Sequence, residues 1–316
     1  MTSASTSSAQ LSTDLRPTGE QHTITRGDAT ATIASVAASL RTFSIGGVDV
    51  TTPYPDDVTP PFGDGIVLVP WPNRVDRGVW SLDGVEQQLD LTEPARDNAI
   101  HGLLRYTGYE LVERTDDSVT LGATVWPQHG YPFLLETTVR YALIEGPDGH
   151  ELEVTHSITN RSAAKAPAAI GTHPFFTIGD VAPEELVLTL HAATRIEVDD
   201  RLIPTGTSPV DGQVYDLRAG RLLADLNLDH AFADLTPVDG VVASLRSMDG
   251  REVRLVQDEQ HQWVQIFTTR EFPGTSLAVA IEPMTAPPNA LVTGEGLRWV
   301  EPGETWTARW GIQASF

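Results

Sequence analysis

Hydrophobic and polar residues alternate along much of this chain, in short runs separated by turn residues. Apolar side chains take most alternate positions over residues 119–125, 135–141 and 151–158. Because successive side chains of a β-strand point to opposite faces, this alternation predicts strands that bury one face. Runs with the same character occur at 22–25, 29–36, 48–50, 186–191, 253–256 and 263–268.

Turn signals separate these runs. The pair Gly46-Gly47 precedes 48–50, and Asp-Gly dipeptides, which are typical of hairpin turns, occur at 83–84, 148–149, 211–212, 239–240 and 249–250. The chain shows no long helical periodicity, no repeat at a fixed spacing and no linker that would divide it. We therefore expect an all-β fold, with residues 21–316 forming one large antiparallel β-sandwich of two packed sheets.

Residues 1–20 differ from the rest of the chain. They are rich in Ser and Thr and lack the basic start and apolar centre of a signal peptide. We expect them to form a disordered tail.

Composition narrows the class of protein. The 316 residues carry 21 Lys+Arg against 43 Asp+Glu, a formal charge of −22, which argues against nucleic acid or an anionic membrane as a partner. The absence of cysteine excludes disulfides and thiolate metal sites. No apolar run approaches the roughly 20 residues needed to span a bilayer. A soluble cytoplasmic protein is expected, and its oligomeric state stays open.

The stretch 278–290 holds the first candidate for chemistry. Small apolar residues lead into Glu282, and Pro283 follows directly, so we expect a buried strand that stops at the carboxylate. Poor hydration there is expected to raise the pKa of Glu282, which would make it usable as a general base near neutral pH.

Three loops carry polar residues that a hairpin does not need. In 69–75, Pro70 and Pro72 restrict the backbone that leads into Asn73 and Arg74, as in a rigid binding loop. Taken alone, an arginine in a proline-rich turn is more often a surface residue.

The other two loops each present a histidine. His101 precedes Gly102, whose missing side chain allows another group to approach closely. His173 follows an apolar run and precedes Pro174, which favours an extended backbone at the histidine. Phe175 and Phe176 come next and are suitable as an apolar wall or a stacking surface.

Together the loops and Glu282 suggest acid–base chemistry. An imidazole and a carboxylate can act as acid and base at one pH when their surroundings shift their pKa values apart. A zinc site of two histidines and one glutamate stays possible by residue type. Spacings such as H-E-x-x-H or H-x-H are absent from the sequence, so we expect no metal and no cofactor.

Seven segments in a fixed order resemble the aldose 1-epimerases, also called mutarotases. They are PWPNRV (70–75), HGLLR (101–105), GYPF (130–133), GTHPFF (171–176), LDHAF (228–232), WVQIFTT (263–269) and AIEPMTAPPNAL (280–291). The resemblance covers roughly residues 29–313, and it implies a galactose-mutarotase-like β-sandwich. It also implies an isomerase that interconverts the α and β anomers of a free sugar without a cofactor.

The resemblance implies a role for each matching residue. Glu282 would be the general base at the C1 hydroxyl, and His173 the general acid at the ring oxygen. His101 and Arg74 would stabilise charge as the ring opens. The remaining matches would bind the sugar: Asp229 and Gln265 its other hydroxyls, with Asn73 assisting Arg74.

The sequence leaves the substrate open. Typical galactose mutarotases have a second glycine and an asparagine where this chain has Leu103 and Thr172. A branch that acts on hexose 6-phosphates has a segment like 101–105, and a phosphate site would need arginines such as Arg77, Arg96 or Arg105. A neutral aldohexose such as glucose or galactose is the expected substrate. Hexose-6-phosphate epimerisation and a non-catalytic sugar-binding role of the same fold are the alternatives.

Overall fold

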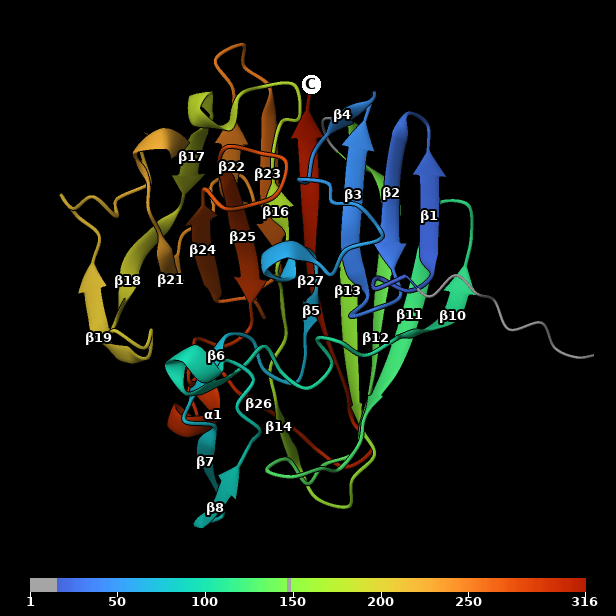
Figure 1. Cartoon of the computed structure of the whole chain (residues 1–316), viewed down its shortest axis with the longest axis vertical. Coiled ribbons are helices and arrows are strands. Elements are labelled where there is room, and N and C mark those ends of the chain that lie inside the picture. Colours follow the sequence, from blue (N-terminus) through green and yellow to red (C-terminus); the bar gives the residue numbers. More distant parts are fainter. Residues whose placement is uncertain (1–15, 147–148) are drawn as a thin grey trace, which may run out of the picture.

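The computed structural model describes residues 16–146 and 149–316. One layer of the fold is a nine-stranded antiparallel sheet (Figure 1). In order across the sheet its strands are β10 (Glu110–Arg114), β11 (Ser118–Val125), β12 (Leu135–Gly146), β13 (Gly149–Asn160), β27 (Thr305–Ser315), β23 (Glu252–Gln257), β22 (Val241–Arg246), β17 (Val187–Leu190) and β20 (Arg221–Leu222).

The alternation in the sequence sets the inner face of this sheet. In β12, Leu135, Val139 and Tyr141 are buried, whereas Glu136 and Arg140 are exposed. The buried set belongs to the main hydrophobic core, as the period of two predicts.

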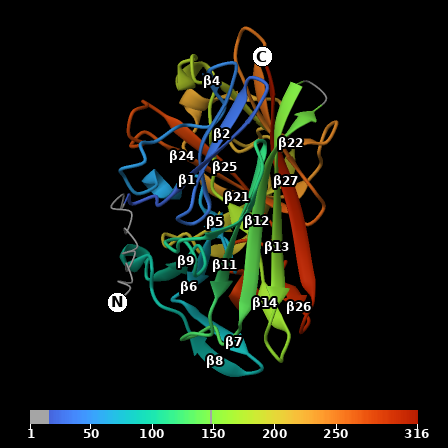
Figure 2. The same cartoon turned by 90° about the vertical axis from the view of Figure 1, so that its right-hand side faces the viewer.

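Two further sheets complete the sandwich. The eight-stranded sheet runs β19 (Pro204–Pro209), β18 (Ala192–Val198), β21 (Asp229–Leu235), β24 (Trp263–Thr269), β25 (Ala278–Met284), β15 (Gly171–Thr172) and β5 (Val67–Leu68), and β16 (Phe175–Phe176) also pairs with β25. The four-stranded sheet runs β1 (Gln21–Arg26), β2 (Ala29–Ala34), β3 (Ser39–Ile45) and β4 (Val48–Asp49). Figure 2 shows β12, β13 and β27 along one side of the molecule and β24 and β25 on the other.

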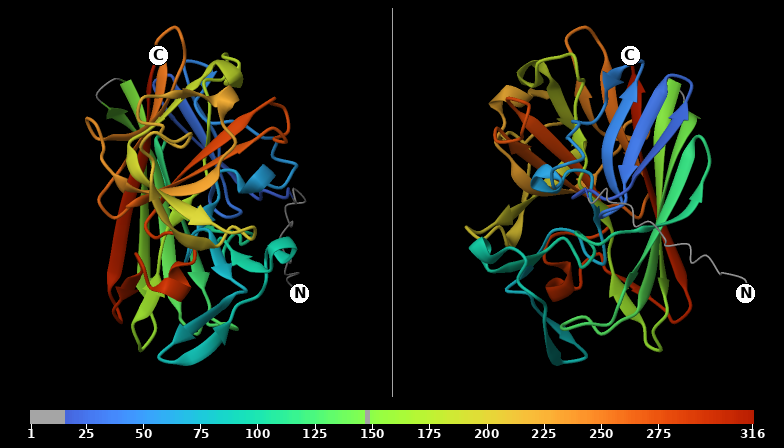
Figure 3. Two further views of the ribbon diagram at one scale, coloured as in Figure 1. Left: turned by 90° about the vertical axis from the view of Figure 1, so that its left-hand side faces the viewer. Right: turned by 45° about the vertical axis from the view of Figure 1, so that its right-hand side comes forward.

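Short elements connect the sheets. Three strand pairs stand apart: β6 (Arg74–Asp76) with β9 (Asn98–Ile100), β7 (Val79–Leu82) with β8 (Val85–Gln88), and β14 (Ala166–Ala168) with β26 (Arg298–Val300). The helical segments are α1 (Ala290–Thr293) and the 3₁₀ turns η1 (Pro61–Gly63), η2 (Pro94–Arg96), η3 (Pro183–Glu185) and η4 (Leu223–Asp225). The β7–β8 hairpin and α1 lie near one end of the molecule, the lower end in Figures 1 and 3.

Strand β25 is buried on both faces. Val279 and Ile281 point into the main core. The opposite face carries Ala280, which packs with aromatic residues in a smaller cluster, and Met284, which packs against Trp263 in another. Glu282 lies between Ala280 and Met284 on that face, because side chains two residues apart share a side.

The prediction that Pro283 ends this strand is wrong, since β25 continues through Pro283 to Met284. The N–H groups of Ile281 and Thr285 donate to Pro174 and Ile170, on the side of β25 away from β24. Backbone nitrogens two residues apart in a strand face the same side. Pro283 is two residues from both Ile281 and Thr285, so its nitrogen also faces away from β24. Its missing N–H therefore removes no bond from the β24–β25 ladder.

The other sequence predictions have mixed outcomes. The all-β sandwich and the strand segments are confirmed, with most strand ends shifted by a residue or two; the segment predicted at 135–141 continues five residues further, to Gly146. The pair at 211–212 does not form a hairpin turn, because β19 and β20 belong to different sheets. Asp148 of another predicted turn lies outside the described residues.

The expected tail is described only in part. Thr18 is fully buried and its hydroxyl donates to the Asp56 carbonyl, so residues 16–20 already pack against the domain. Residues 1–15 lie outside the described residues, and disorder there stays a prediction. Within the described residues, no helix is long and apolar enough to cross a membrane.

Candidate active site

Hydrogen bonds hold the proline-rich segment that leads into Arg74. The Pro70 carbonyl accepts a hydrogen bond from the Ala169 N–H at 2.7 Å, which holds the segment on the sheet. Asn73 has φ 54°, and its side-chain oxygen accepts the Arg74 N–H at 2.8 Å. Asparagine tolerates this left-handed conformation better than most residues. Arg74 then starts β6 with its side chain 9% exposed.

The glycine after His101 is needed for a close approach. A Cβ at Gly102 would lie 2.1 Å from the Val69 carbonyl oxygen, so only glycine fits there. The N–H of His101 donates to the Asn73 carbonyl at 3.0 Å. These contacts bring the first two candidate loops side by side.

His173 is held by its backbone. Its carbonyl accepts the Gly65 N–H at 2.8 Å, and its N–H donates to the Ile66 carbonyl at 3.1 Å. The imidazole stacks on the Phe175 ring at 5.4 Å between centroids and meets the His101 ring edge-on at 5.5 Å. Phe175 is therefore a stacking surface, as predicted, but it lies fully buried beneath the histidine.

Glu282 meets His173 at the centre of the site. Its Oε1 is 3.3 Å from His173 Nε2, and the glutamate is only 2% exposed. Glu282 Oε2 and His173 Nδ1 are both buried and have no hydrogen-bond partner among residues 16–146 and 149–316. This contact joins the two groups that the sequence singles out as base and acid.

Burial shifts the pKa values of these groups in opposite directions. It raises the pKa of Glu282 well above its usual value, and the Asp229 charge adds to that shift. It lowers the pKa of His173 to about 4. It also lowers the pKa of His101 well below 6.5, with help from His173 and two arginines. Both imidazoles are thus neutral at neutral pH.

Asp229 and Gln265 form a neighbouring pair. They lie on the adjacent strands β21 and β24, and Gln265 Nε2 donates to Asp229 Oδ1 at 2.6 Å. Asp229 Oδ2 is 3.7 Å from Arg74 Nη2, while Gln265 Oε1 is buried and unpaired. Gln265 also pairs across the ladder with Glu282, which places the amide beside the acid–base pair.

All seven predicted site residues line one cavity of about 430 Å³. They come from segments far apart in the sequence: Asn73, Arg74, His101, His173, Asp229, Gln265 and Glu282. The cavity is therefore polar and carries charges of both signs.

The cavity wall also contains residues that the sequence did not single out. Phe62 and Phe267 form an aromatic edge, with ring centroids 5.9 Å apart. Glu93 accepts two hydrogen bonds from Arg74, at 2.9 and 3.1 Å. Neither Phe62 nor Glu93 sits in a motif of its own, so no local signal identified them.

The three arginines considered for a phosphate separate in the structure. Arg96 and Arg105 line the cavity, whereas Arg77 does not and instead contacts Asp76 and Asp97 on the surface. Arg105 Nε is buried and unpaired. As for metals, residues 16–146 and 149–316 contain no group of three or more His, Cys, Asp or Glu arranged to hold an ion.

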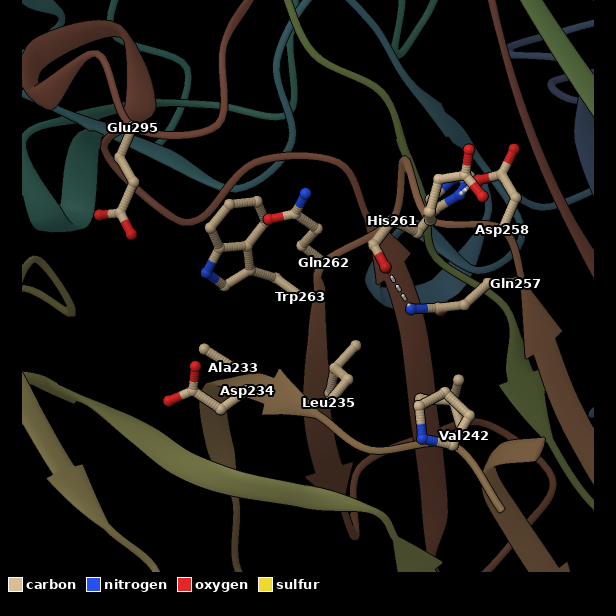
Figure 4. A pocket seen from close by; sticks show the side chains of 12 residues that line it. Ala233, Asp234, Leu235, Val242, Gln257, Asp258, His261, Gln262, Trp263 and Glu295 are labelled. Atoms are coloured by element: carbon tan, nitrogen blue, oxygen red, sulfur yellow. Dashed lines mark hydrogen bonds and ion pairs between the residues drawn. The ribbon is translucent and has the colours of Figure 1, made fainter. Parts of the chain in front are cut away.

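A second, larger cavity of about 630 Å³ contains none of the predicted site residues (Figure 4). Its lining includes Trp263 and the carboxylates Asp234, Asp258, Glu259 and Glu295. Gln257 Nε2 donates to the His261 carbonyl at 2.8 Å across one wall. The volume of a cavity alone therefore does not identify the candidate site.

Comparison with known proteins identifies the family. The profile described as "Aldose 1-epimerase" matches residues 20–313. The chain belongs to the aldose 1-epimerase family. This confirms the resemblance carried by the seven sequence segments, and the family is one of isomerases.

Two related proteins share about a third of the aligned residues with this chain. YihR of Escherichia coli strain K12, an uncharacterized protein, is 31% identical over 292 residues, with 92% of each chain covered. Human galactose mutarotase is 32% identical over 184 residues, which cover 53% of this chain and 51% of the human protein.

Solved structures in the family share the fold. A GalM/aldose epimerase homologue from C. elegans superposes with a TM-score of 0.81 at 18% identity, covering 94% of this chain and 98% of the other. A galactose 1-epimerase from Lactobacillus acidophilus gives a TM-score of 0.77 at 19% identity, covering 94% and 95%. These likenesses confirm the galactose-mutarotase-like fold expected from the sequence.

Proposed function

We propose that this protein interconverts the α and β anomers of a free aldohexose such as glucose or galactose. The single observation that supports this most is the buried contact between Glu282 and His173, 3.3 Å apart at the wall of a polar cavity. In a cyclic sugar the anomeric hydroxyl and the ring oxygen are bonded to the same carbon. An acid and a base that act on these two atoms must therefore lie close together.

The proposed reaction moves two protons. Ionised Glu282 accepts the proton of the C1 hydroxyl while protonated His173 gives a proton to the ring oxygen, so the bond from C1 to the ring oxygen breaks. Rotation about the C1–C2 bond turns the other face of the C1 carbonyl toward the oxygen that was part of the ring. Return of both protons then closes the ring as the other anomer.

The pKa shifts of the pair are compatible with this cycle. The raised pKa of Glu282 and the pKa of about 4 at His173 favour a protonated glutamate beside a neutral histidine. In the proposed cycle this is the state reached once the ring has opened, so ring opening starts from the less populated arrangement, in which the shared proton is on His173. The pair holds one proton before and after ring opening, so the cycle needs no exchange of protons with solvent.

The other residues would bind and orient the sugar. Asp229 and the unpaired Gln265 Oε1 are hydrogen-bond acceptors for hydroxyl groups. Arg74 and neutral His101 would stabilise charge that develops near the ring oxygen. Asn73 would act through the backbone of Arg74, to which its side chain is bonded.

Hexose-6-phosphate epimerisation is the second candidate, and Arg105 favours it. Arg105 and Arg96 both line the cavity, and Arg105 Nε has no hydrogen-bond partner in the described part of the chain. Arg96 is, however, bonded to Glu93, and the whole chain carries a charge of −22. We therefore place the neutral sugar first.

Anomer exchange measured by NMR on a panel of aldoses, with and without the protein, tests the proposal. We expect faster exchange of free glucose or galactose in its presence. A folded protein that binds these sugars and leaves every exchange rate unchanged would instead be a non-catalytic carbohydrate-binding member of the fold.

A further inference from the structure

Glu93 is the most highly bonded side chain in the wall of the active-site cavity. Its Oε2 accepts from Arg74 Nε at 2.9 Å and from Asn98 Nδ2 at 3.1 Å. Its Oε1 accepts from Arg74 Nη2 at 3.1 Å and from Arg96 Nη1 at 3.2 Å. Burial acts to raise the pKa of Glu93, but these hydrogen bonds outweigh it and hold the pKa below the usual value. Glu93 is therefore ionised at neutral pH.

The backbone of Glu93 is fixed as well. Its N–H donates to the Asn98 carbonyl at 2.9 Å, and the Asn98 N–H donates back at 3.2 Å. Asn98 starts β9, and Ile100 of that strand pairs with Arg74 in β6. Glu93 and Arg74 thus belong to one small backbone unit, which sets the position of the carboxylate relative to the guanidinium.

This carboxylate orients Arg74. A two-bond contact between a carboxylate and a guanidinium fixes the plane of the arginine fork. The other acidic neighbour of Arg74, Asp229, is more distant at 3.7 Å. The direction in which Arg74 faces the cavity therefore depends mainly on Glu93.

The same carboxylate balances the charge of the cavity. Arg74, Arg96 and Arg105 line the wall, and Glu93 pairs with the first two. Arg105 contacts the Ile100 carbonyl and the Tyr106 hydroxyl, with no ion pair to a carboxylate in the described part of the chain. Removing the Glu93 charge would leave Arg96 and Arg105 without an ion pair in the described part of the chain, and Arg74 with only its longer contact to Asp229.

We propose that Glu93 is a positioning and specificity-determining residue, which orients Arg74 and makes the cavity prefer uncharged aldoses to their 6-phosphates. This rests on the proposed epimerase function. An anion is attracted to unpaired guanidinium groups, whereas a neutral sugar needs Arg74 held in one orientation.

Glu93→Gln tests the inference, because it keeps the shape of the side chain and removes the charge. Anomer exchange is measured on glucose and glucose 6-phosphate, giving kcat and KM for each. For glucose we expect kcat to fall about tenfold, the size of losing one hydrogen bond to a charged group. For glucose 6-phosphate we expect a lower KM, so the ratio of the two kcat/KM values shifts at least about tenfold toward the phosphate.

Two further variants are matched controls. Glu86→Gln makes the same chemical change at an exposed position of β8 and should leave the ratio unchanged. Glu93→Asp keeps the charge but shortens the reach, so it should lower kcat on glucose while the ratio stays near that of the wild type.

The outcomes separate this inference from the proposed function. A wild-type protein that accelerates exchange of neither sugar contradicts the function. A wild type that is active, with a folded Glu93→Gln variant whose substrate ratio is unchanged, overturns the inference alone. If Glu93→Gln does not fold, Arg96→Gln takes its place. It removes a positive charge from the wall and should shift the ratio toward glucose, and no shift would again overturn the inference.

Discussion

Among the described residues, two close contacts between a buried histidine and a carboxylate lie at the walls of cavities, and their surroundings differ. His173 and Glu282 are 3.3 Å apart in the candidate active site. His261 and Asp258 are 2.9 Å apart beside the larger, acidic cavity. The residue types and distances are similar, so neither of these distinguishes the proposed acid–base pair from the other contact.

The surroundings of the carboxylates make the difference. Asp258 accepts backbone hydrogen bonds from Arg309 at 2.7 Å and from Gln260 at 3.1 Å. Although burial acts to raise the pKa of Asp258, these bonds and His261 lower it overall, so the group stays ionised. In the part of the chain that the structure describes, Glu282 accepts no such backbone hydrogen bond, and burial raises its pKa. Hydrogen bonds to the ionised form favour it, so Asp258 keeps its charge, whereas Glu282, in which burial dominates, takes up a proton more readily.

The largest expected effect is that of Glu282→Gln. The amide keeps the size of the side chain but cannot accept the proton of the C1 hydroxyl. The catalysed rate should fall about 10²–10⁴-fold, the usual contribution of one general base. Polarimetry on freshly dissolved α-glucose or α-galactose measures the rate. Near-normal activity in a folded variant would show that Glu282 is not the base.

The pH dependence of activity should reflect the shared proton of the His173–Glu282 pair. A second proton enters the pair near the His173 pKa of about 4, and the single proton leaves near the raised pKa of Glu282. Activity should therefore fall below about pH 4 and again above the Glu282 pKa, by about tenfold per pH unit on each side. A rate that is constant across both limits would mean that the pair does not carry the transferred protons.

Much of the fold was predictable because it follows from local alternation. The inward set of β12, such as Val139 and Tyr141, is visible in the sequence alone. The end of β25 was not, because the cost of Pro283 depends on which side its nitrogen faces in the sheet. That direction is set by segments more than a hundred residues away, such as Pro174.

The candidate site likewise contains residues that the sequence indicated and residues that it did not. Glu282 stood out because it ends an apolar run, and His173 because it follows a glycine-terminated apolar run and precedes Pro174. Glu93 did not stand out, since its contact with Arg74 depends on the pairing of β6 with β9. Phe62 reaches the cavity from a 3₁₀ turn in which it has φ 52°, a conformation that its sequence does not signal.

The arginines should respond less strongly than Glu282 and in a substrate-dependent way. Arg74→Ala should lower kcat/KM for glucose by about 10–100-fold, since it removes charged hydrogen bonds near the reacting atoms. Arg105→Ala should change the same value by no more than about threefold, because a neutral sugar does not need its charge. Exchange measured by NMR on glucose and glucose 6-phosphate checks both. A strong preference for the phosphate that is lost in Arg105→Ala would overturn the neutral-sugar proposal and leave the acid–base pair in place.

The smallest expected effect on activity is that of Asp258→Asn. If Asp258 serves the fold and not the reaction, the rate should stay within about twofold of the wild type. The free energy of unfolding should fall by about 1–3 kcal/mol, because the amide is a weaker acceptor for the N–H groups of Arg309 and Gln260. Because folding lowers the pKa of Asp258, its carboxylate stabilises the folded protein at pH values above its unfolded pKa. This stabilisation is lost as the pH falls through the folded pKa. Urea unfolding at neutral and acidic pH should therefore show a difference between variant and wild type that shrinks in acid. An activity loss comparable to that of Glu282→Gln, in a variant that remains folded, would mean that the Asp258–His261 contact also serves the reaction.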